Sequence, residues 1–126
     1  MIIQSQNKSM ALIRIKNLAL QTFIGFNPEE KVNKQEVIIN LEMEVDVPAH
    51  ALETDDPEGI YDYKKITKQV ISLVEEGRFH LLEVLTHKIL VLVMENQKVK
   101  KAIVQVDKPG ALRFAESVSA EMEARR

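Results

Sequence analysis

The feature that most constrains the fold is an alternation of apolar and polar residues over positions 37–47. Every odd position in this run is apolar, whereas four of the five even positions are polar or acidic, the exception being Ile38. Neighbouring side chains of a β-strand point to opposite faces, so the pattern predicts a strand with one buried face. One-sided burial is typical of antiparallel sheets, and the run is long for a strand in a chain of 126 residues. We therefore expect an antiparallel sheet of long strands.

A second alternation precedes this strand and contains an irregularity. Ile13 and Ile15 alternate with charged residues, and the apolar phase then shifts near Asn17. A single phase shift inside a strand indicates a β-bulge, in which one extra residue is inserted into one strand of a pair. We therefore expect a bulged strand that pairs with the strand over residues 37–47.

The rest of the chain supplies two helices and two further strands. Apolar residues recur at helical spacing in two segments and at every second position in two later ones. The resulting order ββααββ predicts an α+β domain, with a four-stranded antiparallel sheet and both helices on one face. The expected elements are a strand over 12–22, a loop over 25–34, the strand over 37–47, a turn-rich connection over 48–62, helices over about 63–76 and 81–96, and strands over about 99–107 and 114–123.

The length of 126 residues allows one domain. Residues 1–11 are polar and aperiodic and predict a flexible tail, so the domain is expected over residues 12–126. The opening MIIQSQNKSM lacks the apolar core of a signal peptide, and no run approaches the roughly 18–20 apolar residues of a membrane span. We expect a cytoplasmic protein that is not bound to a membrane.

Charge and composition exclude several classes of function. With 17 Lys and Arg against 19 Asp and Glu, the net charge of -2 disfavours a nucleic-acid partner. The chain has no cysteine, which excludes thiolate catalysis and cysteine-based zinc sites. Of the three histidines, only His80 and His87 are spaced to share a helix face, and two ligands without a third are weak evidence for a metal site. No metal is therefore expected.

An open sheet of long strands has two edges with unpaired backbone groups. Proteins cap such edges or pair them, because a free edge promotes aggregation. Pairing between copies would continue the sheet into a ring, so we expect a symmetric homo-oligomer.

Glu30 and Lys108 are the first candidates for a functional site. Glu30 lies in the expected loop, where a carboxylate can bind hydroxyl groups or exchange protons, although such a residue is more often part of a solvated charge cluster. Lys108 follows a strand and precedes Pro109 and Gly110, which end the strand. A lysine at the mouth of a pocket can carry protons, and a solvated surface lysine is the alternative.

Three further residues lie where a helix begins. Tyr61 and Tyr63 stand at the start of the first helix, where a phenol can exchange a proton or stack on a flat ring, or simply pack. Glu83 lies in an apolar run at the first turn of the second helix. The helix dipole stabilises a carboxylate there, and the same carboxylate could accept two N–H bonds from a planar amidine-like ring.

Four segments, taken in order, resemble one known family. They are IRIKNLALQTFIGFNPEEKVNKQEVIIN (13–40), YDYKKITKQV (61–70), RFHLLEVLTHKIL (78–90) and VDKPGALRFAESVS (106–119). Together they resemble the dihydroneopterin aldolases, and within that family the branch of dihydroneopterin-triphosphate 2'-epimerases. The resemblance implies the tunnelling fold, with the same ββααββ order. It also implies rings of four subunits, usually stacked in pairs as octamers, with each pocket between neighbouring chains.

The resemblance also implies roles for the candidate residues. Glu30 would bind the hydroxyl groups of the substrate side chain, and Lys108 would transfer a proton. Tyr63 would also transfer a proton, acting across a subunit interface. Glu83 would anchor the 2-amino group and ring N–H of a pterin. The remaining substrate contacts would come from backbone groups near Tyr61 and Leu82 and from Arg113, with Lys31 and Lys34 as further cations near a triphosphate.

The implied chemistry is retro-aldol cleavage between C1' and C2' of a dihydropterin side chain. The pterin ring accepts the electrons, so neither a metal nor a cofactor is needed. Re-addition of the aldehyde after rotation gives the 2'-epimer, which we favour as the activity, whereas its release as glycolaldehyde is the aldolase reaction of folate biosynthesis. KPGA (108–111) resembles the aldolase branch more closely. The alternative from another class of function is an oligomeric protein ring that binds a pterin or purine and has no catalytic activity.

Overall fold

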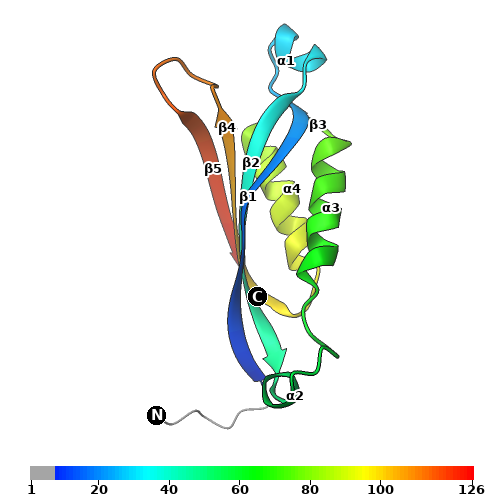
Figure 1. The fold of residues 1–126 in the computed structure, drawn as a ribbon. Helices are drawn as coiled ribbons and strands as arrows, with labels where there is room; N and C mark the ends of the chain where they lie inside the picture. Colours follow the sequence, from blue (N-terminus) through cyan, green and yellow to red (C-terminus); the bar gives the residue numbers. More distant parts are fainter. Residues whose placement is uncertain (1–7) are drawn as a thin grey trace.

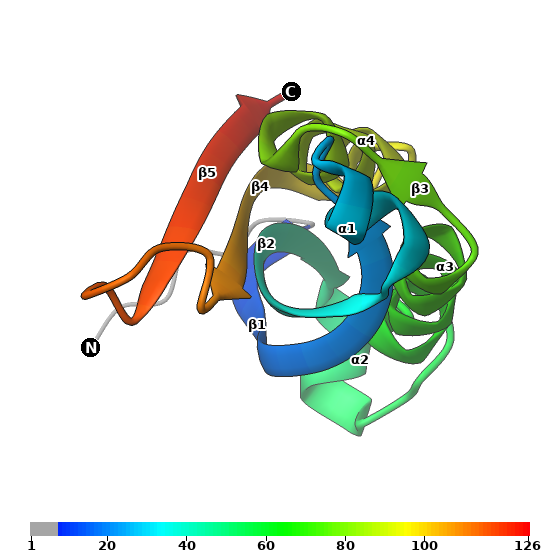
Figure 2. The same cartoon turned by 90° about the horizontal axis from the view of Figure 1, so that it is seen from above.

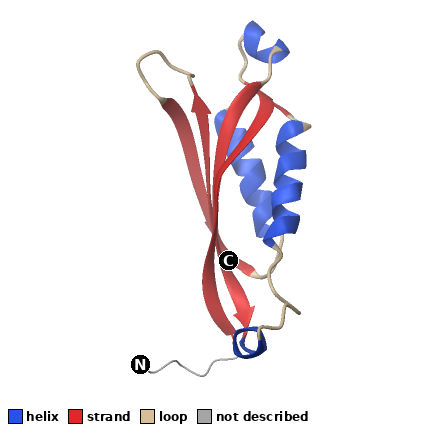
Figure 3. Ribbon diagram, in the orientation of Figure 1, coloured by secondary structure: helices blue, strands red, loops and turns tan. Residues whose placement is uncertain are grey.

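The computed structural model describes residues 8–126, which form a curled sheet with helices packed on one face (Figures 1 and 3). Helices α3 and α4 cover the sheet, whereas the short helices α1 and α2 lie at opposite ends of the long axis. In chain order the elements are β1 (Lys8–Ile24), α1 (Pro28–Val32), β2 (Gln35–Pro48), α2 (Ala49–Thr54), α3 (Tyr63–Glu75), β3 (Arg78–Phe79), α4 (Leu82–Met94), β4 (Val99–Pro109) and β5 (Ser117–Arg125).

β1 and β2 form a long antiparallel hairpin at the centre of the sheet. The register shifts between Ile15 and Leu18, and Asn17 has a positive φ of 55°. The backbone N–H of Asn17 donates to Oδ1 of Asn40 on β2 at 2.9 Å, so the side chain of β2 satisfies a backbone group that the bulge removes from the ladder. The bulge expected near Asn17 is thus confirmed.

The strand order is β3-β1-β2-β4-β5. The pairs β1–β2, β2–β4 and β4–β5 are antiparallel, whereas β3 is a two-residue strand that runs parallel to the end of β1. Seen from above, the sheet curls, and the two helices lie outside the curl (Figure 2). Within residues 8–126, most of the outer edge of β1 and the whole outer edge of β5 have no strand partner.

The core lies between the sheet and the two long helices. Every odd-numbered side chain of β2 from Val37 to Val47 is buried, as the alternation predicts. α3 packs on β1, and α4 packs on β4 and β5. The helical side chains buried against the sheet are Ile66, Val70 and Val74 on α3 and Leu85, Thr86, Ile89, Leu90 and Val93 on α4.

Asp62 defines the start of α3. Its side chain accepts hydrogen bonds from the backbone N–H groups of Lys64 and Lys65, both at 3.0 Å. These groups have no partner within the helix, so the cap stabilises the first turn. The cap places Tyr61 immediately before the helix and Tyr63 at its first position.

Three elements were not expected from the sequence, and they correct the prediction of four strands and two helices. α1 lies within residues 25–34 and α2 within residues 48–62, both expected as loops. Neither helix has a buried residue, so neither leaves an apolar period in the sequence. β3 is only two residues long and depends on its contact with β1, which no local pattern reveals.

The starting residues of the first and last predicted strands also need correction. β1 begins at Lys8, within the tail expected over residues 1–11, and the rest of that tail lies outside the described residues. The last strand begins at Ser117 rather than at residue 114. Phe114 is fully exposed and has a positive φ of 69°, which breaks the extended backbone before the strand. None of the helices between residues 8 and 126 is both long and apolar enough to span a membrane.

Candidate active site

Glu30 is held in place by α1 and by the turn before it. Its Oε1 accepts the backbone N–H of Asn27 at 3.2 Å, and its own N–H donates to the Asn27 carbonyl at 3.0 Å. Gln35 donates from Nε2 to the Ile24 carbonyl at 2.9 Å and, more weakly, to Glu30 Oε2 at 3.5 Å. Gly25 has a φ of 119°, and a Cβ at this position would overlap the Glu30 carboxylate. The glycine therefore allows the carboxylate to fold back over the loop.

Lys108, at the end of β4, forms an ion pair with Glu30 that joins residues 78 positions apart in the sequence. The two side chains are only 13% and 20% exposed. The hydrogen bond from Lys108 lowers the pKa of Glu30 below its usual 4.5, and it outweighs the opposite effect of partial burial. The site therefore holds an ionised carboxylate beside an ammonium group, both largely shielded from water.

A pocket of about 200 Å³ opens beside Glu30. One wall is stabilised by Arg78, whose guanidinium lies 3.9 Å from the centre of the Phe23 ring and donates to the Lys31 carbonyl at 3.1 Å. The backbone N–H of Gly25 donates to the Phe79 carbonyl at 2.8 Å, which ties the loop to β3. The residues lining the pocket are Phe23, Gly25, Glu30, Lys31, Arg78, Phe79 and His80.

α4 begins two residues after His80, so its first turn lies close to this pocket. Glu83 is exposed in that first turn, and Leu82 is half-buried beside it. The positive end of the helix dipole favours a carboxylate at this position. Glu30, Lys108, Leu82 and Glu83 thus lie at the end of the molecule that carries α1 (Figure 1).

The two tyrosines lie away from these residues, at the end of the helical layer that is farther from α1 (Figure 1). α3 begins at its end farthest from α1, where a loop connects it to α2, and Tyr63 is 51% exposed there (Figure 1). Tyr61 is 5% exposed and packs into the core. A single chain therefore brings Glu30 and Lys108 together but does not bring Tyr63 to them.

Arg113 lies on the loop between β4 and β5, five residues after Lys108. Its guanidinium lies 5.2 Å from the centre of the Phe114 ring, and the loop is exposed. Lys34 lies 5.7 Å from the centre of the Phe23 ring, at the pocket wall, and Lys31 lines the pocket itself. Lys31 and Arg78 thus line the pocket beside Glu30, although the net charge of the chain is negative.

Several supporting residues could not be identified from the sequence. Gln35 positions both the loop and Glu30, and Arg78 braces Phe23, yet each occurs in an ordinary polar stretch with no distinctive spacing. The helix that carries Glu30 has one local signal, the sequence Asn27-Pro28-Glu29-Glu30, because Asn followed three residues later by Glu is typical of a helix start. Across the part of the chain that the structure describes, no three His or acidic side chains come together to hold a metal ion.

Comparison with known sequences identifies the family. The sequence model described as FolB, dihydroneopterin aldolase, matches residues 13–123, which is most of the chain. The chain belongs to the dihydroneopterin aldolase family. This membership confirms the resemblance inferred from the four segments.

Two relatives within the family carry a more specific name. The chain is 54% identical over 117 residues to a dihydroneopterin triphosphate 2'-epimerase of Pseudomonas aeruginosa, covering 93% of this chain and 94% of the relative. It is 43% identical to the protein of the same name in Escherichia coli, covering 92% and 96%.

Solved structures agree with the fold. A FolB structure from Vibrio cholerae, assigned to the dihydroneopterin aldolases, superposes with a TM-score of 0.86 at 31% identity, covering 94% of this chain and 99% of that chain. The Escherichia coli dihydroneopterin aldolase in complex with neopterin superposes with a TM-score of 0.80 at 26% identity, covering 90% and 98%. The α+β architecture of the family is therefore present in full.

Proposed function

We propose that this family member is an enzyme that epimerises 7,8-dihydroneopterin triphosphate at C2', giving dihydromonapterin triphosphate, and that it acts in the cytoplasm. The observation that carries the proposal is the 54% identity, over 93% of the chain, with the Pseudomonas aeruginosa protein of that name. The partly buried Glu30–Lys108 pair beside a pocket supports acid–base chemistry at this site.

The reaction begins with loss of the proton from the 2'-hydroxyl group. The C1'–C2' bond then breaks, C2' becomes an aldehyde carbon, and the electron pair moves into the C6=N5 imine of the ring. Rotation of the aldehyde and attack by the same enamine re-form the bond with the opposite configuration at C2', and the hydroxyl regains its proton. The substrate accepts its own electrons, so the protein needs only to bind it and move protons.

Lys108 and Glu30 suit this proton transfer because they already form a pair. The lowered pKa of Glu30 keeps it ionised, so it can accept hydrogen bonds from the side-chain hydroxyls. Substrate hydroxyls that bind Glu30 compete with Lys108 for the carboxylate. The amine of Lys108 is then free to exchange a proton with the 2'-oxygen of the substrate. Low exposure of both side chains limits competition from water.

The pterin ring is proposed to bind at the start of α4. A pterin presents a 2-amino group and a neighbouring ring N–H on one edge, and the carboxylate of Glu83 can accept both. Glu83 is exposed at a helix N-terminus and makes no ion pair within residues 8–126, so it is available to a ligand. Backbone groups at Leu82 and at Tyr61 of a neighbouring copy would complete the contacts.

Tyr63 is proposed to reach the site from a second copy of the chain. It lies at the start of α3, away from the end of β4 that carries Lys108 in its own chain, and it is half exposed. The free edges of β1 and β5 could pair between copies, and the loop after Lys108 exposes Leu112 and Phe114. These features support the tunnelling-fold ring of four subunits, stacked in pairs as an octamer.

The triphosphate requires cations near the pocket mouth. Arg113 is exposed on the loop after Lys108, Lys31 lines the pocket, and the Lys34 ammonium lies over the ring of Phe23, which also lines it. A guanidinium can bind phosphate oxygens through two parallel hydrogen bonds, so Arg113 is the preferred contact.

Aldolase activity is the second candidate, because the matching family model is that of dihydroneopterin aldolase and the same residues serve both reactions. Release of the aldehyde and protonation of the enamine would give 6-hydroxymethyl-7,8-dihydropterin and, from dihydroneopterin, glycolaldehyde. An oligomer that only binds pterins would need Glu83 for the pterin but would not need the Glu30–Lys108 pair.

Purified protein incubated separately with dihydroneopterin and with its triphosphate tests these possibilities, with products resolved by chromatography. Formation of the monapterin-type triphosphate supports the epimerase, whereas hydroxymethyl-dihydropterin with glycolaldehyde as the main product supports the aldolase. If the protein binds either compound but converts neither, the result supports the oligomeric ring that binds pterins without catalysis.

A further inference from the structure

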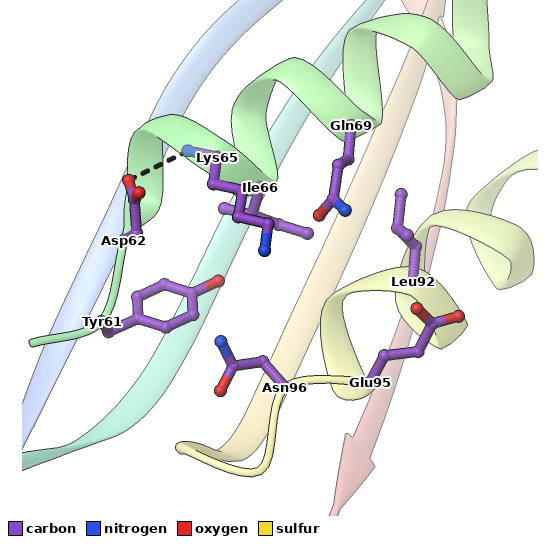
Figure 4. A pocket seen from close by; sticks show the side chains of 8 residues that line it. All are labelled: Tyr61, Asp62, Lys65, Ile66, Gln69, Leu92, Glu95 and Asn96. Atoms are coloured by element: carbon purple, nitrogen blue, oxygen red, sulfur yellow. Dashed lines mark hydrogen bonds between the residues drawn. The ribbon is translucent and has the colours of Figure 1, made fainter. Parts of the chain in front are cut away.

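A separate polar pocket lies between the start of α3 and the end of α4, at the end of the helical layer farther from α1 and the Glu30–Lys108 pair (Figures 1 and 4). Its volume is about 220 Å³, which is below the roughly 300 Å³ lower limit of drug-sized sites and suits a compact metabolite. The residues lining it are Tyr61, Asp62, Lys65, Ile66, Gln69, Leu92, Glu95 and Asn96.

The phenol of Tyr61 is the unusual feature of this pocket. Tyr61 is 5% exposed, its hydroxyl points into the space between the lining side chains, and within residues 8–126 the hydroxyl has no hydrogen-bond partner (Figure 4). Burial, assisted by the nearby charge of Asp62, raises the pKa of Tyr61 to about 12, so the group is a neutral donor. A buried donor without an acceptor is costly, and an acceptor on a ligand would remove that cost.

Two further donors line the same pocket. Oδ1 of Asn96 accepts the backbone N–H of Lys98 at 2.9 Å, which assigns the other end of the amide as the NH₂ group, and among residues 8–126 that group has no hydrogen-bond partner. The side chain of Lys65 extends into the pocket and makes no ion pair in the described part of the chain (Figure 4). Three donors, one of them charged, are thus available to a single acceptor group such as a carboxylate.

The opposite side of the pocket carries an acceptor. Glu95 lies across the pocket from Tyr61, with apolar wall supplied by Leu92, and its carboxylate has no ion-pair partner between residues 8 and 126 (Figure 4). Asp62 is occupied by the cap of α3. Lys65 contributes one positive charge, and Asp62 and Glu95 contribute two negative charges, so the lining sums to -1. This sum disfavours a dianion such as phosphate and favours a molecule with both a negative and a positive end.

We propose that this pocket binds a small zwitterion, an α-amino acid. Its carboxylate accepts hydrogen bonds from Tyr61 Oη, Asn96 Nδ2 and Lys65 Nζ, and its ammonium group pairs with Glu95. The proposal does not rest on the epimerase assignment, and the two sites share only Tyr61: its side chain lines this pocket, whereas its backbone is proposed to contact a pterin bound to a neighbouring copy. The bound molecule would sit directly behind the start of α3, two residues from Tyr63.

Ligand-observed saturation-transfer NMR with the full-length protein tests the site. The proteinogenic amino acids are offered singly at about 10 mM, above a dissociation constant on the order of 1 mM. Acetate and methylammonium are the controls, because each carries only one of the two charged groups of an amino acid. We expect at least one amino acid to bind and to bind more tightly than either half.

Two variants and a matched control assign the binding to this pocket. Asn96→Asp keeps the oxygen that accepts from Lys98 but replaces the NH₂ donor by a negative oxygen, and Lys65→Met removes the ammonium group. Each should weaken binding about tenfold to hundredfold, as loss of a hydrogen bond to a charged group requires. Lys68→Met, on α3 outside the pocket, should leave binding unchanged. Thermal melting verifies that all three variants are folded.

Three results would overturn the proposal. The first is that no amino acid binds, and the second is that binding is equal in wild type, Asn96→Asp and Lys65→Met. The third is a crystal structure grown with the amino acid that shows only water, or a side chain of a neighbouring copy, at the Tyr61 hydroxyl. Density for an amino acid whose carboxylate contacts Tyr61 would confirm it.

Discussion

Replacement of Lys108 by methionine is predicted to remove turnover while leaving pterin binding nearly intact. Methionine keeps the unbranched stem and removes the ammonium group, so the change is confined to the end that contacts Glu30. Lys108 is 13% exposed, and its hydrogen bond in the described structure is to the Glu30 carboxylate. The ring anchor proposed here is Glu83 on α4, a different element, so the ring contacts should persist.

Two separate magnitudes follow for this variant. A positioned acid–base group contributes about 10²–10⁴-fold to the rate, or roughly 3–5 kcal/mol of barrier, and kcat should fall by that factor. The dissociation constant for a pterin should change less than about tenfold. Loss of the charge-assisted hydrogen bond to a largely shielded carboxylate should also cost about 1.5–3 kcal/mol of stability, so turnover must be measured well below the melting temperature.

Single-turnover kinetics and a fluorescence titration with a pterin measure the two quantities independently. Lys101→Met is the matched control, because Lys101 is on the same strand and forms an ion pair with Glu123, at 3.6 Å, that is more exposed than the Glu30–Lys108 pair. That variant should retain nearly full activity. A Lys108→Met enzyme within tenfold of the wild-type kcat, or one that loses binding and turnover in equal proportion, would refute the assigned role.

Two further predictions concern the carboxylates. Glu83→Ala should weaken pterin binding at least tenfold in the same titration, because each hydrogen bond to a charged group contributes about 1.5–3 kcal/mol, and unchanged affinity would remove Glu83 from the site. The folded-state pKa of Glu30 lies below its ordinary value of 4.5, so its ionisation stabilises the fold above pH 4.5, and this contribution is lost as the pH falls through the lowered pKa. Denaturant unfolding should therefore show Glu30→Gln to be less stable than wild type at pH 7 and nearly equal to it in strong acid. A stability difference that stays constant across that range would contradict the ion-pair interpretation.

The central strand shows how much of the fold a sequence can reveal. Burial on one face imposes a period of two on β2, and the bulge at Asn17 interrupts that period in β1, so both could be read from residue patterns. The elements that could not be predicted are those without a buried face, α1 and α2, and β3, whose two residues are extended because the end of β1 lies beside them.

The candidate site likewise has residues that the sequence could nominate and contacts that only the folded structure reveals. Chemistry and the family resemblance could nominate Glu30, Lys108 and Glu83, but contact between Glu30 and Lys108 arises only because the end of β4 meets the loop after β1. The support from Gln35 and Arg78 depends on the same tertiary arrangement. Phe114 was expected to belong to the last strand because its apolar character fits the alternation, yet the backbone turns at this residue and leaves it exposed.

Complementation between two inactive variants tests most directly the claim that each working site combines the Glu30–Lys108 end of one chain with Tyr63 of another. Lys108→Met and Tyr63→Phe proteins are unfolded together in equal amounts, refolded, and assayed for epimerisation of dihydroneopterin triphosphate. Random assortment should restore about a quarter of the sites, each with Lys108 from one chain and Tyr63 from its neighbour. Activity in the mixture no greater than the mean of the two separately refolded variants would contradict the shared site.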